Sequence, residues 1–189
     1  MDLFSLIHRM HLFVRNKDWT GLEVEFETIG RSLAGAELTN KILDIDTSEY
    51  QRRLSAGLSP TITKAKNHEA KAVYFEYDLD NNWAGHFFIC QDYNPISEYE
   101  PGDDDWACEW IEHFDAGDFV PFGELYVPGF DVTEVATGVN SFLIARTVAA
   151  FGRSCDDFRS EAFAICMAFH DQDPIVRVHE PFGESETNL

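Results

Sequence analysis

The spacing of apolar and polar positions predicts helices at the start of the chain. From Asp2 to Val14 apolar residues recur every three or four positions, and Asp2 is a candidate N-cap. Thr20 and Glu23 have the spacing of a capping box, and helical spacing continues after them. Residues 22–29 also alternate apolar and acidic side chains, which leaves a strand open there, but the longer pattern favours a helix.

Two more helical segments are expected before the pattern changes. A short helix fits Ala36 to Ile45, and another is expected around Ser48 to Leu54. The run Gly57-Leu58-Ser59-Pro60 predicts that the helical part stops there.

After Lys71 the apolar period becomes two, which predicts two hairpins. In the first, AVYFEY and WAGHFFIC flank the turn residues 78–82. In the second, residues 161–169 and 175–179 flank Asp171-Gln172-Asp173-Pro174. Between the hairpins, Asp131 and Glu134 have capping-box spacing at the start of a long helix that we expect to end at Gly152.

These elements predict one α+β domain over residues 1–189. The expected parts are a helical part (1–57), a hairpin, helix and hairpin part (71–180) and a frayed tail (181–189). The two hairpins are expected to form an antiparallel sheet, with the long helix between them packed on it.

The segment PGDDDWACEWIEHFDAGDF, residues 101–119, is predicted to be an acidic amphipathic helix. If Asp103 caps a helix that ends at Gly117, Trp106, Trp110 and Phe114 share one face, which we expect to be buried. The opposite face then carries acids. It is either an ordinary solvent-exposed face or the centre of a protein-binding surface, and a metal site is a third alternative.

Charge separates the middle of the chain from its flanks. The net charge is -20, from 34 acidic and 14 basic side chains. Between Ala72 and Ala145, 74 residues hold sixteen carboxylates and no Lys or Arg, together with sixteen of the 26 aromatic residues. Such a field attracts cationic partners, while buried aromatic residues supply contact energy. The alternatives are that the acids only maintain solubility or reflect a salt-adapted organism, and the balanced first 71 residues argue against the latter.

The charge disfavours nucleic acid and anionic membranes as ligands, because both are bound through Lys and Arg. No apolar run approaches a membrane span, and Asp2 and Arg9 interrupt any secretory leader. The four cysteines are Cys90, Cys108, Cys155 and Cys166; their wide spacing and apolar neighbours predict buried free thiols in a reducing cytoplasm.

Catalytic and cofactor motifs are missing from the sequence. It holds no GxSxG elbow and no phosphate-binding glycine loop, so we expect neither an enzyme nor a cofactor. Asp78-x-Asp80-x-Asn82 begins like a calcium loop but lacks the later Gly and Glu, which favours a hairpin turn. His8 and His11 have helical spacing without a matching ligand cluster, His86 is expected on a strand, and a raised pKa at His113 would be unremarkable among carboxylates.

In type, the acidic stretch Glu98 to Asp118 and the aromatic hairpin AVYFEYDLDNNWAGHFFICQDY resemble the small acidic immunity proteins of bacterial polymorphic-toxin and contact-dependent inhibition systems. The resemblance implies stoichiometric inhibition of a basic toxin, most directly a nuclease, whose cationic groove the acidic face covers. The residues that we expect to bind the partner are the nine carboxylates of that stretch: Glu98, Glu100, Asp103, Asp104, Asp105, Glu109, Glu112, Asp115 and Asp118. A nucleic-acid mimic that blocks several DNA-binding proteins and an enzyme of undetected type remain the alternatives, and the oligomeric state is left open.

Overall fold

The computed structural model describes residues 2–95, 110–158, 161–172 and 175–181. In chain order its elements are α1 (Leu3–Asn16), α2 (Trp19–Leu33), α3 (Ala36–Leu43), α4 (Ser48–Asn67), β1 (Ala72–Asp78), β2 (Ala84–Cys90), β3 (Trp110–Gly117), α5 (Val120–Gly123), α6 (Glu134–Ser154), the 3₁₀ turn η2 (Asp156–Phe158), β4 (Ala164–Phe169) and β5 (Val176–His179). The predicted α+β class is confirmed, and residues 22–29 are helical.

The five strands form one mixed sheet in the order β3-β2-β1-β4-β5. Both predicted hairpins are present: β1 pairs with β2 and β4 with β5, each antiparallel. The hairpins join through β1 and β4, which are parallel, so the expectation of a wholly antiparallel sheet is wrong at this pairing. A crossover that contains a helix as long as α6 returns the chain to the end of the sheet from which it left, and this makes a parallel pair feasible.

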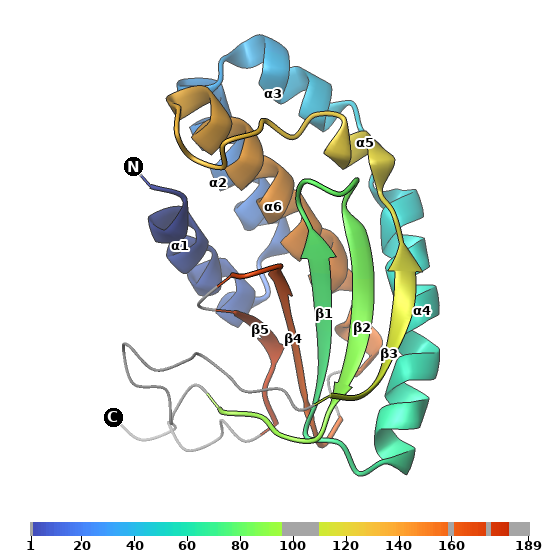
Figure 1. The fold of residues 1–189 in the computed structure, drawn as a ribbon. Coiled ribbons are helices and arrows are strands. Elements are labelled where there is room, and N and C mark those ends of the chain that lie inside the picture. The colour runs from blue at the N-terminus through green and yellow to red at the C-terminus, as the bar shows by residue number, and fades with distance from the viewer. Residues whose placement is uncertain (1, 96–109, 159–160, 173–174, 182–189) are drawn as a thin grey trace, which may run out of the picture.

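The described helices lie on one face of the sheet and along its margins, as Figure 1 shows, and we call the opposite face the open face. Helix α6 is confirmed as the helix that packs on the sheet, where Phe151 stacks on Phe75 of β1 with ring centroids 5.1 Å apart. Helix α2 packs on the other side of α6. The two approach closely at Gly138, where a Cβ atom would lie 2.8 Å from the Cβ of Leu33. Because α6 is enclosed from both sides, its sequence has no polar stripe.

Helix α4 contradicts the predicted break at Gly57-Pro60. It runs unbroken through Pro60, although proline removes an N–H and crowds the preceding turn. The buried side chains at helical spacing outweigh that cost: they are Tyr50, Leu54, Leu58, Ile62 and Ala65. Gly57 serves packing instead, because a Cβ there would lie 2.6 Å from the Phe87 ring of β2. The helical part therefore extends to residue 67.

Helix caps agree with prediction at one helix and differ at two. Asp2 caps α1, where its Oδ1 accepts the Ser5 N–H at 2.8 Å. Helix α2 begins one residue before the expected capping box, because Asp18 accepts the Gly21 N–H at 2.8 Å. Helix α6 is capped by Thr133 rather than Asp131, and it ends at Ser154, two residues after Gly152.

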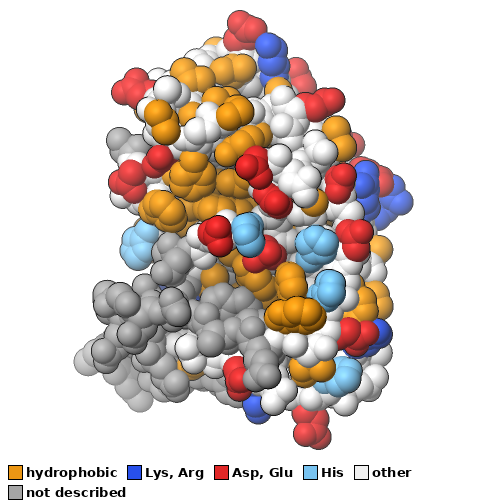
Figure 2. Space-filling view, viewed as in Figure 1, with side chains coloured by type: hydrophobic (Ala, Val, Ile, Leu, Met, Phe, Trp, Pro, Cys, Tyr) orange, Lys and Arg blue, Asp and Glu red, His pale blue; other side chains and the backbone are white. Residues whose placement is uncertain are grey.

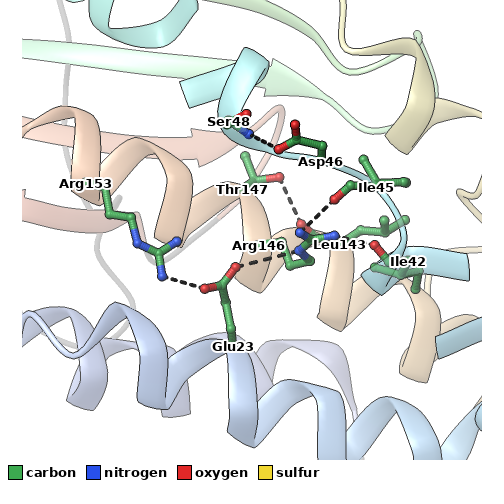
Figure 3. Close-up of polar contacts among 9 residues, drawn as sticks. All are labelled: Glu23, Ile42, Ile45, Asp46, Ser48, Leu143, Arg146, Thr147 and Arg153. Atoms are coloured by element: carbon green, nitrogen blue, oxygen red, sulfur yellow. Dashed lines mark hydrogen bonds and ion pairs between the residues drawn. The ribbon is translucent and has the colours of Figure 1, made fainter. Parts of the chain in front are cut away.

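A largely buried ion-pair network, drawn in Figure 3, fixes the helices to one another. The Arg146 guanidinium of α6 donates to the carbonyl oxygens of Ile42 and Ile45 and lies 3.7 Å from Glu23. Arg153 reaches the other oxygen of Glu23 at 2.5 Å. Burial lowers the pKa of Arg146, and Glu23 opposes that shift. These contacts join α2, α3 and the segment before α4 to the central helix.

The prediction of buried free thiols is correct at two cysteines and wrong at a third. Cys155 and Cys166 are free and buried. Cys90, at the end of β2, is disulfide-bonded, and Cys108 lies outside the described residues. The expectation failed because it rested on spacing and neighbours alone, which do not fix the distances that allow a disulfide.

Candidate functional site on the open face of the sheet

Strand alternation places a defined set of side chains on the open face. Residues of β1 that face α6, such as Val73 and Phe75, belong to the main core, so their neighbours point the other way. The sheet register groups these open-face residues in rows: Glu76, His86 and Asp115; then Tyr74, Phe88 and His113; then Ala72, Cys90 and Trp110. These residues are far apart in the sequence, and only the pairing of β1, β2 and β3 brings them together.

The predicted acidic helix is a strand in its described part. Residues Trp110–Gly117 form β3, the edge strand beside β2. Phe114 faces α4, where the Lys64 ammonium lies 4.2 Å from its ring centre, and Trp110 is 54% exposed instead of buried. The i, i+4 spacing of Trp110 and Phe114 favoured a helix, but pairing with β2 overrides that local pattern. Trp106 lies outside the described residues.

An aromatic group, the Trp110 cluster (Trp110, Phe88 and His113), occupies the exposed part of the open face. The Trp110 ring meets His113 edge-on at 5.0 Å and 86°, and Phe88 at 6.0 Å and 69°. Phe88 and His113 stack at 5.9 Å. These contacts restrain the indole while leaving about half of it open to a partner.

Beside the cluster, acidic and histidine side chains form a second group. Glu76 accepts the Tyr74 hydroxyl at 3.2 Å, and its other oxygen lies 3.3 Å from Nδ1 of His170. The hydrogen bond to Glu76 raises the pKa of His170, with further contributions from Asp171 and Asp78. Burial raises the pKa of Tyr74, which therefore stays protonated and continues to donate.

The turn between β1 and β2 places two carboxylates together. Burial raises the pKa of Asp78, and a hydrogen bond with Asp80 raises it further. The structure confirms the hairpin turn in place of a calcium loop: the five residues from Leu79 to Trp83 are turn residues. Among the residues that the structure describes, no three His, Cys, Asp or Glu side chains are placed to hold a metal ion.

The other part of the open face is covered. Ala72, Tyr74, Cys166 and Ala168 belong to a second buried cluster, against which Tyr93 packs. The Tyr93 hydroxyl donates to Glu180 at 2.5 Å and accepts from Nε of Arg177 at 3.0 Å. These contacts fix the segment after β2 to β5. Arg177, which pairs with Cys166 of β4, is a cation on the same face of the sheet, and it is held there by Tyr93 and the Asn94 carbonyl oxygen.

The nine predicted partner-binding carboxylates divide into three groups. Six lie outside the described residues: Glu98, Glu100, Asp103, Asp104, Asp105 and Glu109. Asp115 is exposed on the open face, and Asp118 is exposed just after β3. Glu112 lies on the other face of β3 and points toward α4, where Lys64 lies 2.5 Å and His68 3.7 Å from its carboxylate.

Basic side chains are concentrated away from the open face. The first 71 residues, which form α1 to α4, contain ten of the fourteen Lys and Arg. Arg146 and Arg153 turn toward Glu23. Figure 2 shows the same side as Figure 1: hydrophobic side chains gather in its upper part, acidic and histidine side chains form a band below them, and Lys and Arg lie toward the edges.

Sequence reasoning placed His86 on a strand, as the structure shows, but it missed Glu76, His170 and the outward position of Trp110. In the structure Glu112, Phe114 and Ala116 alternate with more exposed neighbours, but the sequence of β3, WIEHFDAG, has no matching alternation of apolar and polar residues. No local signal joins Glu76 to His170, because they lie 94 residues apart. Tertiary pairing alone creates this part of the site.

A pocket of about 420 Å³ lies elsewhere, at the end of α4 and before β4. Its lining includes Lys66, Lys71 and Glu161, and Lys66 and Glu161 form an ion pair at 2.8 Å.

Of the described helices, α6 is long and apolar enough to cross a membrane, but 94% of its apolar window is buried inside the structure, as in the core helix of a soluble protein.

Comparisons of the chain with protein-family models, with curated proteins and with solved structures find no match. The residues of the open face are therefore the basis for a proposed function.

Proposed function

We propose that this chain is a protein-binding inhibitor, an immunity protein that neutralises a basic toxin by covering its cationic surface. The observation that carries the proposal is the exposed Trp110 cluster on a sheet face whose three strands β1, β2 and β3 contain no Lys or Arg. Exposed aromatic residues are preferred anchors of protein interfaces, and a field of one sign accelerates encounter with an oppositely charged partner.

A nuclease is the toxin class that best fits this surface. The groove of a nuclease must be cationic to hold phosphates, and a carboxylate-rich face competes for that groove. The proposal involves binding and no catalysis. Two exposed acids supply charge, Asp80 in the β1–β2 turn and Asp115 on the open face, and we call them the open-side acids; Trp110 supplies contact area.

A cytoplasmic location belongs to the same proposal, because a nuclease toxin meets nucleic acid there. The disulfide at Cys90 counts against it, since reducing compartments keep such bonds rare. The redox state of Cys90 in cells tests the location: cells are quenched with acid, and free thiols are then alkylated under denaturing conditions. Cytoplasmic residence predicts Cys90 as a thiol, and an oxidised Cys90 in cells contradicts that part of the proposal.

Coexpression tests the inhibitor role. We expect the gene directly upstream to encode a large secreted protein that ends in a small basic toxin domain. Expression of that domain should arrest a bacterial host, and coexpression of this chain should restore growth and abolish nuclease activity at a one-to-one ratio. Failure to protect, or an upstream metabolic gene, would contradict the proposal. Equal protection against unrelated nucleases would establish a general nucleic-acid mimic instead.

A further inference from the structure

We infer that the Trp110 cluster is an arginine subsite: a guanidinium group of the basic partner stacks on the exposed indole face. This inference rests on the proposed function and specifies the chemistry that the partner brings to the open face.

The geometry of the indole carries the inference. Trp110 is 54% exposed, yet edge contacts with His113 and Phe88 hold its ring in one orientation. Among the described residues, the cations that lie over aromatic rings use Phe114, Phe122 and Tyr93, and none lies over Trp110. The described part of the chain thus presents a fixed aromatic surface over which none of its cations lies.

The surroundings of Trp110 favour a cation over an apolar insert. Asp115 lies on the same face of β3 and is exposed, and Glu76 lies in the same row of the sheet as Asp115. A cationic side chain that stacks on the indole is therefore attracted by Asp115 on the same strand and by Glu76 on β1. Histidine side chains also line this surface: the rings of His86 and His113 lie 6.4 Å apart.

Arginine suits this surface better than lysine does. A guanidinium is planar and weakly hydrated, so it stacks on an aromatic face with little desolvation cost, whereas an ammonium is a compact and strongly hydrated charge. Cation–π contacts at exposed sites change affinity by about two- to fivefold, and tryptophan is the strongest aromatic partner.

The test compares hexa-arginine and hexa-lysine peptides as probes of the full chain at pH 7.5 and physiological salt. Two-dimensional NMR follows the Trp110 indole N–H, assigned from the spectrum of Trp110→Phe, and the backbone amides of residues 112–115. We expect saturable shifts at these signals and tighter binding of hexa-arginine, by about twofold or more.

Two variants give the control. Trp110→Leu keeps an apolar side chain but removes the ring, and it should lower hexa-arginine affinity by about two- to fivefold and abolish the preference over hexa-lysine. Phe4→Leu alters another exposed aromatic residue, on α1, and should leave both peptides unaffected.

The outcomes distinguish this inference from the function on which it rests. Equal affinities for both peptides, or an unchanged preference in Trp110→Leu, would overturn the arginine subsite while electrostatic binding survives. If neither peptide moves any signal of the open face, the site fails together with the proposed binding surface.

Discussion

At the scale of single residues, carboxylates of the open face contact neutral or weakly basic side chains. Glu76 illustrates this: it accepts a hydrogen bond from Tyr74, and its contact with His170 raises the pKa of that imidazole. Protonation of His170 then places a positive charge directly beside the Glu76 carboxylate.

The His170–Glu76 contact predicts a pH-dependent stability. Because Glu76 raises the folded-state pKa of His170 above its ordinary value of 6.5, the contribution of the contact is complete below about pH 6.5 and is lost as the pH rises through the folded pKa. Glu76→Gln should lower the His170 pKa, read from its imidazole signals by NMR. It should also cost more unfolding free energy at pH 5.5 than at pH 8.5. An unchanged His170 pKa would show that the contact does not form in solution.

At the scale of elements, strand β3 decides whether the aromatic residues of the acidic segment stabilise the fold or bind a partner. Trp83, in the turn before β2, is fully buried, and its indole N–H donates to Thr147 at 2.9 Å. Trp110 on β3 is half exposed. The same residue type thus has two roles, and substitution separates them.

Trp83→Ala should lower the free energy of unfolding by about 3–5 kcal/mol, because it leaves a cavity in the core. Trp110→Ala should lower it by no more than about 1 kcal/mol, which is the size of a cross-strand aromatic contact. Urea denaturation of both variants measures the difference. A loss at Trp110 as large as that at Trp83 would place Trp110 in the core and remove it from the binding face.

The junction of α6 with the N-terminal helices predicts a second contrast. Arg146→Ala should cost about 3–5 kcal/mol, because it removes a buried charge and leaves the carbonyl groups of Ile42 and Ile45 without this donor. Arg153→Ala, at a more exposed contact with the same Glu23, should cost less than about 1 kcal/mol. Urea unfolding measures both changes, and similar losses would mean that the buried carbonyl contacts contribute little.

The elements that could be predicted from the sequence are those whose structure is set by residues close to them in the chain. The β1–β2 hairpin and the N-cap Asp2 were foreseen because turn residues and caps act within a few positions. Strand β3 and the continuous helix α4 were not, because pairing with β2 and burial against the sheet override local propensity. For the candidate site, the acid and aromatic composition pointed to a segment that includes β3, where Asp115 is exposed on the open face. The position of Glu112 toward α4 follows from the pairing of β3 with β2, and its ion-pair partner Lys64 is 48 residues away in the sequence.

At the scale of the whole molecule, charge is divided between two sides. Helices α1 to α4 hold most of the Lys and Arg, and many pair with acids on their own helix, such as Lys41 with Glu37 at 2.9 Å. Strands β1, β2 and β3 contain acids but no Lys or Arg, and of these acids Glu112 pairs with Lys64 of α4 while Asp115 is exposed on the open face. A basic partner should therefore approach the sheet side first, with a rate that falls as salt screens the field over about 8 Å at physiological ionic strength.

The most direct measurement is the association rate with the upstream-encoded toxin domain, followed by stopped flow across a salt series. Two double charge reversals give a matched pair: Asp80→Lys with Asp115→Lys on the open side, and Asp44→Lys with Glu69→Lys in the helical part. The account predicts a rate that falls steeply with salt and is about tenfold slower only for the open-side pair. Equal losses from both pairs, or a rate indifferent to salt, would contradict it.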